Sequence, residues 1–162
     1  MRAYFPPLLA VFLLVLPLSA FAQQPAPVFT LPTLPDNGEI SLAALKGRVV
    51  YLDFWATWCL PCRKSFPWMD EMQTRYGDDG LTIVAISIDR SRQLAERFIQ
   101  QMQPGFIIAH DAKGSVAKKY RISAMPTSYL IDRNGNIVST HSGFRTSDET
   151  KLERKIGDLL DQ

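Results

Sequence analysis

The chain has 162 residues, a length that suits one domain. With 46% hydrophobic and 21% charged residues, its composition is that of an ordinary globular protein. The formal charge is only +2, and the lysines and arginines are scattered. The sequence therefore gives no indication of a nucleic-acid or anionic-membrane surface, and we expect no nucleic-acid partner.

The first 22 residues have a pattern of their own. Arg2 is followed by an apolar run over 8–18 and then by small residues that end at Ala22, which is typical of a secretory signal. The run has about 11 residues, whereas a membrane-spanning helix needs about 20. We predict a signal peptide over 1–22, cleavage after Ala22 and a periplasmic location. An uncleaved N-terminal membrane anchor is the alternative.

Residues 23–162 are predicted to form one domain of alternating strands and helices. The turn signal at 36–38 predicts a β-hairpin, and the nearly continuous apolar run over 48–56 predicts a strand that is buried on both faces and ends near Trp55. In chain order the sequence then predicts a helix over 60–76 that contains Pro67, a strand over 81–89, a helix after Ser91 with Leu94, Phe98, Ile99 and Met102 on its buried face, a strand over 105–111, a short helix over 115–122, a hairpin around 133–136, and a C-terminal helix capped by Thr146 and Glu149.

This order of elements predicts an α/β fold. Helices should cover both faces of a mixed sheet, which gives a three-layer α/β/α sandwich with a single core.

Cys59 and Cys62 are the only cysteines of the chain. A structural staple is one interpretation, but so short a loop constrains the unfolded chain little. A zinc site needs more ligands, and the two histidines, His110 and His141, lie on separate predicted strands, so we expect no metal.

A redox pair is the third interpretation of these cysteines. At the start of the predicted helix the two residues are neighbours on one face. An exposed Cys59 would meet free backbone N–H groups and the positive end of the helix dipole, both of which stabilise a thiolate. Cys62, one turn deeper, should be more shielded, as suits a resolving thiol.

The stretch "DFWATWCLPC", followed later by "AMPTSYLIDRNGNIV", resembles the thioredoxin superfamily. The export signal and the extra segment around 90–110 make the chain most similar to the TlpA/ResA-like extracytoplasmic thiol–disulfide oxidoreductases. The resemblance covers about residues 28–160. It implies a thioredoxin fold with an N-terminal β-hairpin and a central strand–helix insertion, disulfide exchange with protein substrates, and no cofactor.

The resemblance also implies roles for single residues. Cys59 matches the nucleophilic cysteine and Cys62 the resolving one, and together they would form the redox-active disulfide. The positions that match substrate-binding residues are Trp58, Met125, the cis-proline Pro126 and Gly143. For Trp58, simple packing over the helix start is the alternative.

Asp53 lies in an otherwise apolar strand, where a carboxylate is costly to bury. A strand-edge aspartate bonded to backbone is one interpretation. The resemblance instead makes Asp53 the buried acid behind the cysteines, with a pKa raised by desolvation, which takes a proton from Cys62. Thioredoxins usually carry a lysine near this acid, and the position that we match to it is Ile86.

The resemblance favours a reductant that is recharged by a membrane thiol-reductant carrier, and we expect the protein to be a monomer. Members that reduce apocytochrome c often carry a glutamate three residues after the second cysteine. That position is Ser65 here, which argues against this particular client. A thioredoxin-like binding module without turnover and a thiol peroxidase are the alternatives.

Overall fold

The computed structural model describes residues 24–162, so the predicted signal peptide lies outside the described residues. Within that range, no helix combines the length and the apolar character that crossing a bilayer requires. The elements in chain order are β1 (Gln24–Pro25), β2 (Thr30–Leu34), β3 (Glu39–Ser41), the 3-10 turn η1 (Leu42–Leu45), β4 (Val49–Trp55), α1 (Leu60–Tyr76), β5 (Leu81–Ser87), α2 (Arg92–Met102), β6 (Ile107–His110), α3 (Ser115–Lys119), β7 (Thr127–Ile131), β8 (Asn136–Ser142), the 3-10 turn η2 (Thr146–Asp148) and α4 (Glu149–Leu160).

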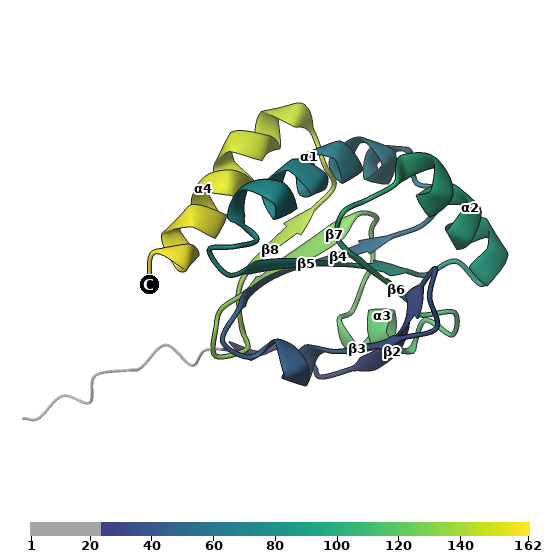
Figure 1. The fold of residues 1–162 in the computed structure, drawn as a ribbon, viewed down its shortest axis with the longest axis horizontal. Coiled ribbons are helices and arrows are strands. Elements are labelled where there is room, and N and C mark those ends of the chain that lie inside the picture. Colours follow the sequence, from purple (N-terminus) through teal and green to yellow (C-terminus); the bar gives the residue numbers. More distant parts are fainter. Residues whose placement is uncertain (1–23) are drawn as a thin grey trace, which may run out of the picture.

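The strands form one mixed sheet in the order β1-β8-β7-β4-β5-β6-β2-β3. Strands β4, β5 and β6 are parallel, whereas β7 runs antiparallel to β4 and β8 antiparallel to β7. Helices α1, α2 and α4 cover one face of the sheet, and α3 lies on the other (Figure 1). The β2–β3 hairpin joins the sheet where Thr33 and Leu34 pair with β6, and from there it bends toward the side of α3. The predicted three-layer α/β fold and its N-terminal hairpin are therefore confirmed.

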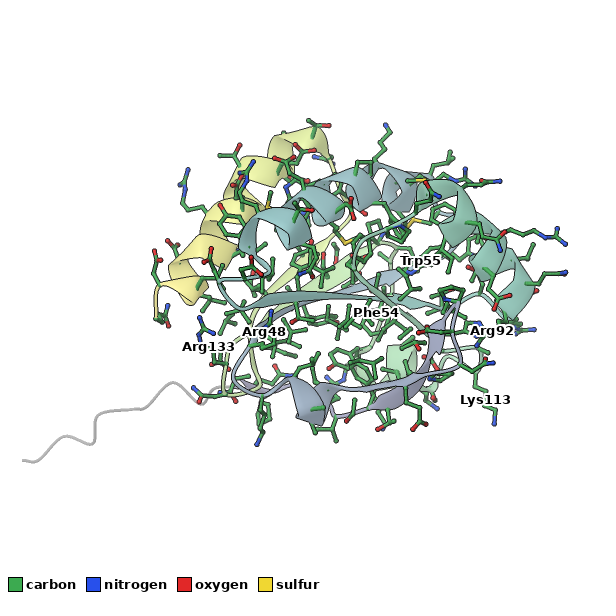
Figure 2. The ribbon with its side chains drawn as sticks, viewed as in Figure 1. Arg48, Phe54, Trp55, Arg92, Lys113 and Arg133 are labelled. Carbon is green, nitrogen blue, oxygen red and sulfur yellow. A yellow bond between two sulfur atoms is a disulfide. The ribbon has the colours of Figure 1, made fainter. Side chains whose placement is uncertain are left out.

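Strand β4 lies at the centre of the core, because all seven of its residues are buried. Trp55 points toward the large helices and packs on Phe66 and Phe98, with ring centroids 5.0 and 4.8 Å apart. Phe54 points to the opposite face and packs on Tyr120 at 5.3 Å; Figure 2 labels Phe54 and Trp55 on the two sides of the sheet. This packing explains why the strand has an almost continuous apolar sequence rather than an alternating one.

Helix α1 has the bounds that the sequence predicts. Cys59 is its N-cap, proline occupies the first turn, where its missing N–H costs no hydrogen bond, and Gly77 is the C-cap. Pro67 lies inside the helix, as expected.

Two details of the helix predictions are wrong. The buried face of α2 contains Ala95 rather than Leu94, which is 49% exposed, because the helical stripe runs through 95, 98 and 99 and position 94 lies at its margin. At the C-terminal helix, Thr146 and Glu149 do not form the cap. Residues 146–148 form the turn η2, and the Asp148 carboxylate accepts a hydrogen bond from the Arg145 N–H at 3.0 Å.

Candidate active site

Cys59 and Cys62 form a disulfide at the beginning of α1, with their Cα atoms 5.3 Å apart. The Cys59 Sγ also accepts a hydrogen bond from the Cys62 N–H at 3.2 Å. Helix geometry therefore presents the first sulfur to the free N–H groups of the first turn, which stabilise negative charge there. The pair can open and close without a large backbone movement, because helical spacing holds the two residues at bridging distance.

The expectation of an exposed Cys59 is wrong for the disulfide form. Cys59 is 4% exposed and Cys62 is fully buried, so the predicted order of accessibility holds but the sulfur is recessed. The reason is that both residues belong to the apolar cluster beneath α1, together with Trp55 and Phe66.

The side chains that project around this recessed sulfur are apolar. Trp58 and Leu60, on either side of Cys59, are 68% and 72% exposed. Trp58 therefore does not pack over the helix start, and its ring is free to contact another molecule. Exposed aromatic side chains of this kind are typical of binding surfaces.

Asp53 is 1% exposed and lies on β4. It shares a face of the strand with Tyr51 and Trp55, both members of the cluster that contains the cysteines. Burial raises the pKa of this carboxyl well above its usual value, and a hydrogen bond with Ser128 lowers it in part. Within residues 24–162 its Oδ2 atom has no hydrogen-bond partner. A strand-edge aspartate bonded to backbone does not describe this residue.

The match of Ile86 to the lysine position of thioredoxins is wrong by one residue. Ala85 is the residue of β5 in register with Asp53. Ile86 is in register with Phe54 and belongs to the apolar cluster on the opposite face of the sheet. The conclusion that no cation stands beside Asp53 on β5 is unaffected, since alanine carries no charge.

The structure brings together three of the predicted substrate-binding residues, Met125, Pro126 and Gly143. The Met125–Pro126 peptide bond is cis, and the Gly143 N–H donates to the Pro126 carbonyl at 2.8 Å. Gly143 has φ +80°, a conformation that favours glycine. Because Phe54 and Thr127 are in register, Pro126 lies at the edge of the sheet where β4 ends and the cysteine loop begins.

Met125 is half-buried and packs against both apolar clusters. Its backbone N–H and carbonyl take part in no hydrogen bond within the described part of the chain.

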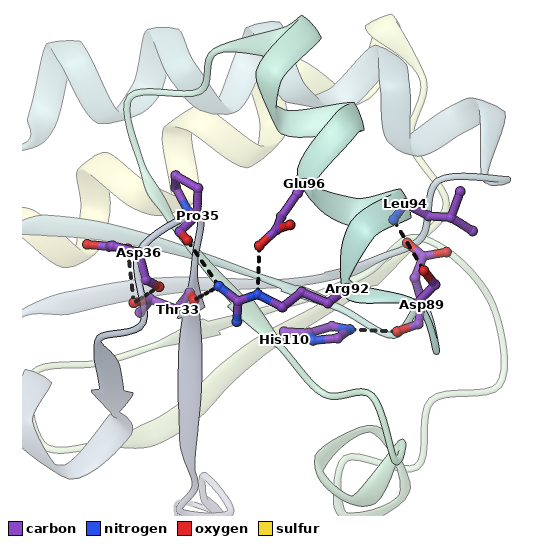
Figure 3. A network of polar contacts seen from close by, with 9 residues as sticks. Thr33, Pro35, Asp36, Asp89, Arg92, Leu94, Glu96 and His110 are labelled. Carbon is purple, nitrogen blue, oxygen red and sulfur yellow. Dashed lines mark hydrogen bonds and ion pairs between the residues drawn. The ribbon is translucent and has the colours of Figure 1, made fainter.

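Sequence reasoning missed the residue that holds the cysteine loop, Asp89. Its buried carboxylate accepts hydrogen bonds from the backbone N–H and the hydroxyl of Thr57, both at 2.9 Å, and from the Ser87 hydroxyl at 3.0 Å. The His110 Nε2 donates to the Asp89 carbonyl at 2.7 Å (Figure 3). The sequence does contain a signal for this contact. Asp89 follows β5 and Thr57 follows β4, and the carboxyl ends of parallel strands meet at one edge of a sheet.

Ser65 lies three residues after Cys62, at the position where the resemblance predicts a glutamate in members that reduce apocytochrome c. Its side chain is buried, and the hydroxyl donates to the Cys62 carbonyl at 2.9 Å. This residue adds no charge beside the disulfide.

Neither a metal centre nor a large cavity coincides with these residues. Among residues 24–162, no three histidine, cysteine or acidic side chains gather in a way that could hold a metal ion. His110 and His141 lie on separate strands, β6 and β8. A cavity of about 880 Å³ lies between β2, α2 and β6, but none of the predicted site residues lines it.

Comparison with known proteins gives the same picture. The AhpC/TSA family profile matches residues 22–140. The chain is 37% identical over 127 residues to the thiol-disulfide oxidoreductase ResA of Oceanobacillus iheyensis, a match that covers 78% of this chain and 65% of the relative. The ResA of Bacillus thuringiensis subsp. konkukian is 35% identical over 124 residues, which cover 76% of this chain and 71% of that one.

A solved structure from Chlorobium tepidum, described as a thiol:disulfide interchange protein DsbE, superimposes with a TM-score of 0.83 at 44% identity. It covers 85% of this chain and 96% of its own. The paired cysteines at a helix start, the cis-proline at the sheet edge where the cysteine loop begins, and these matches agree. The chain therefore belongs to the AhpC/TSA family, with the thioredoxin fold, among the ResA-like thiol–disulfide oxidoreductases.

Proposed function

We propose that this protein exchanges disulfides with protein substrates through Cys59 and Cys62. The observation that carries the proposal is the disulfide at the N-terminus of α1, whose first sulfur accepts a backbone hydrogen bond. In the reduced protein the Cys59 thiolate attacks a substrate disulfide, which forms a mixed disulfide and releases one substrate thiolate. The Cys62 thiolate then attacks Cys59, the second substrate thiolate leaves, and two electrons have passed to the substrate.

Asp53 is the proposed base for the second step. Cys62 is fully buried, so its thiol cannot lose a proton directly to water. Asp53 lies on the face of β4 that packs against the cysteine cluster, and the raised pKa of its carboxyl makes it a good proton acceptor once ionised. A carboxyl in contact with solvent would be a weaker base.

The substrate-binding surface in this proposal surrounds the recessed sulfur. The unpaired backbone groups of Met125 suit pairing with an extended substrate segment, as in other strand-addition complexes. Trp58 offers an exposed ring beside Cys59, and Pro126 and Gly143 form the adjoining loops. Substrates of this kind are protein chains, and no cofactor takes part because the electrons move by exchange.

The proposed setting is outside the cytoplasm, with the pair working as a reductant. The apolar run and small-residue ending of 1–22 support export. A membrane thiol-reductant carrier would recharge the pair, and the protein would act as a monomer. Ser65 in place of glutamate argues against a dedicated role in cytochrome c maturation.

Insulin reduction and trapping test the proposal together. The wild type should accelerate insulin precipitation, and Cys59→Ser should abolish this activity. Cys62→Ser should accumulate mixed disulfides that survive on a non-reducing gel, since the resolving thiol is gone. Equal insulin reduction by the wild type and Cys59→Ser would indicate a binding module instead, and the absence of trapped complexes would contradict the order of attack.

A further inference from the structure

Helices α1 and α2 begin at the same edge of the sheet, next to the disulfide. Strands β4 and β5 are parallel neighbours, and each helix follows the carboxyl end of one of them. The N–H of Thr57, just before α1, donates to the carboxylate of Asp89, just before α2, at 2.9 Å. The first turns of the two helices are therefore neighbours on the surface that contains Cys59.

The side chain of Arg63 connects the two helices. Its guanidinium lies over the ring of Phe98 in α2, 5.1 Å from the ring centroid, and donates to the Thr57 carbonyl at 3.4 Å. Arg63 is nevertheless exposed. A cation is thus held between the two helices with part of its surface open to another molecule.

Two exposed apolar side chains accompany this cation. Leu60 lies three residues before Arg63 on α1, and Leu94 lies four residues before Phe98 on α2, so each shares a helix face with its partner. Leu60 and Leu94 are 72% and 49% exposed. We call Leu60, Arg63 and Leu94 the α1–α2 surface.

The exposed charges beside the α1–α2 surface are positive. Residues 54–69 contain no acidic side chain, and Arg90 and Arg97 are exposed just before and within α2. The carboxylate of Asp89 is buried and accepts hydrogen bonds from the cysteine loop.

The other carboxylate of this region, Glu96, is already paired. Its Oε1 lies 2.6 Å from the Arg92 Nε. Arg92 extends away from Leu94, toward the carbonyls of Thr33 and Pro35 (Figure 3). The described beginnings of α1 and α2 therefore offer exposed cations and no free carboxylate, which complements the charge of an acidic partner.

The α1–α2 surface and the cis-proline lie on opposite sides of the cysteine loop. In the sheet, β4, which leads to Cys59, lies between β7, which begins after Pro126, and β5, which leads to α2. A substrate segment that pairs with Met125 and passes Cys59 therefore continues toward α2. Helices in contact have axes about 8–10 Å apart, a distance that an extended chain covers in about three residues.

We propose that the α1–α2 surface binds the part of a protein substrate that continues beyond its reactive cysteine, and that it selects an acidic residue beside an apolar one. These residues lie about three positions from the reactive cysteine. On binding, Leu60 and Leu94 lose exposed apolar area and Arg63 pairs with the carboxylate. The proposal rests on the proposed function, because it names a substrate preference of the same site.

Peptides in which one cysteine is bonded to a chromogenic aromatic thiol test this preference. The Cys59 thiolate of the reduced protein attacks the peptide sulfur, a mixed disulfide forms and the coloured thiolate leaves. Each peptide carries a leucine next to a glutamate or a glutamine, about three positions from its cysteine on one side or the other. For the wild type at low salt, the second-order rate should be about threefold higher with glutamate on one of the two sides. This ratio should fall toward one at about 0.5 M salt.

Variants assign the preference to single residues. Arg63→Gln should abolish the ratio between glutamate and glutamine peptides. Leu94→Ala should lower, about threefold, the ratio between peptides with leucine and peptides with serine in its place. Because ratios are compared, a change in the reactivity of Cys59 itself cancels.

Lys46→Gln and Val138→Ala are the matched controls, and both ratios should stay at their wild-type values. Lys46 is exposed between η1 and β4, at the end of β4 far from Cys59. Val138 is 43% exposed on β8.

Equal wild-type rates with glutamate and glutamine, or a ratio that Arg63→Gln leaves unchanged, would overturn the proposal. Release of coloured thiolate without any preference would overturn the α1–α2 surface alone, whereas no release from any peptide would show that the proposed function has failed. Sedimentation tests a second copy of the chain as the occupant. A dimer that Leu94→Ala abolishes, together with peptide ratios near one, would also overturn the proposal.

Discussion

As pH rises, the Asp53→Asn variant is expected to become more stable to unfolding relative to the wild type. The carboxyl is 1% exposed, and burial raises its pKa well above the usual value. A carboxyl whose pKa is higher in the folded than in the unfolded chain binds more protons when folded. The free energy of unfolding therefore falls as pH rises from the unfolded pKa, about 3.9, toward the folded one. The slope in that window is at most about 1.4 kcal/mol per pH unit, and asparagine abolishes it.

Thermal unfolding of the oxidised protein at about pH 5 and about pH 6 measures this slope. Between these pH values the wild type should lose stability relative to Asp53→Asn, at up to about 1 kcal/mol per pH unit over the range in which the folded carboxyl stays protonated, which lowers its Tm by a few degrees. Asp78→Asn serves as control, since Asp78 is exposed, and should follow the wild type. If Asp53→Asn and the wild type show the same pH slope, the carboxyl does not carry a raised pKa and the reasoning is refuted.

Three further substitutions test the surface, the loop and the hydrogen bonds of the site. Trp58→Ala should change the free energy of unfolding by less than about 0.5 kcal/mol, because the ring is 68% exposed, yet raise the KM for insulin severalfold; an unchanged KM would argue against substrate contact. Asp89→Ala leaves the Thr57 N–H without its acceptor and should cost about 2–3 kcal/mol in urea unfolding, with slower attack by the loop cysteine; a loss below about 0.5 kcal/mol would contradict the anchoring role. Tyr51→Phe removes the bond to Ser128 and should cost about 1 kcal/mol by the same measurement, whereas a more stable variant would show that this bond contributes nothing.

Local signals in the sequence predicted most of the fold. The bounds of α1 follow from a cysteine cap, a proline in the first turn and Gly77 at the end, all of which act within a few residues. The existence of β4 follows from the nearly continuous apolar run over 48–56, because a strand covered on both faces has no polar side. The cysteine pair was found for the same reason, since only two residues lie between its members.

The contacts that were missed depend on the register of strands far apart in sequence. The shift from Ile86 to Ala85 is one residue, but it moves the side chain to the other face of the sheet. Asp89 and Thr57 are 32 residues apart and meet only because two parallel strands end together. The register that sets Asp53 opposite Ser128, and Ser128 opposite His141, requires the pairing of three strands, which no local pattern in the sequence specifies.

In the proposed function, the depth at which Cys59 lies would limit the disulfides that the protein can reach. Cys59 is 4% exposed, and the flanking side chains of Trp58 and Leu60 project into solvent. A substrate disulfide would therefore have to lie on a protruding or unfolded segment to reach it. Compact proteins whose bridges are buried offer nothing that fits into this recess. Under the proposed reductive function, this shape would protect correctly folded proteins from reduction, while misfolded chains with accessible disulfides would remain substrates.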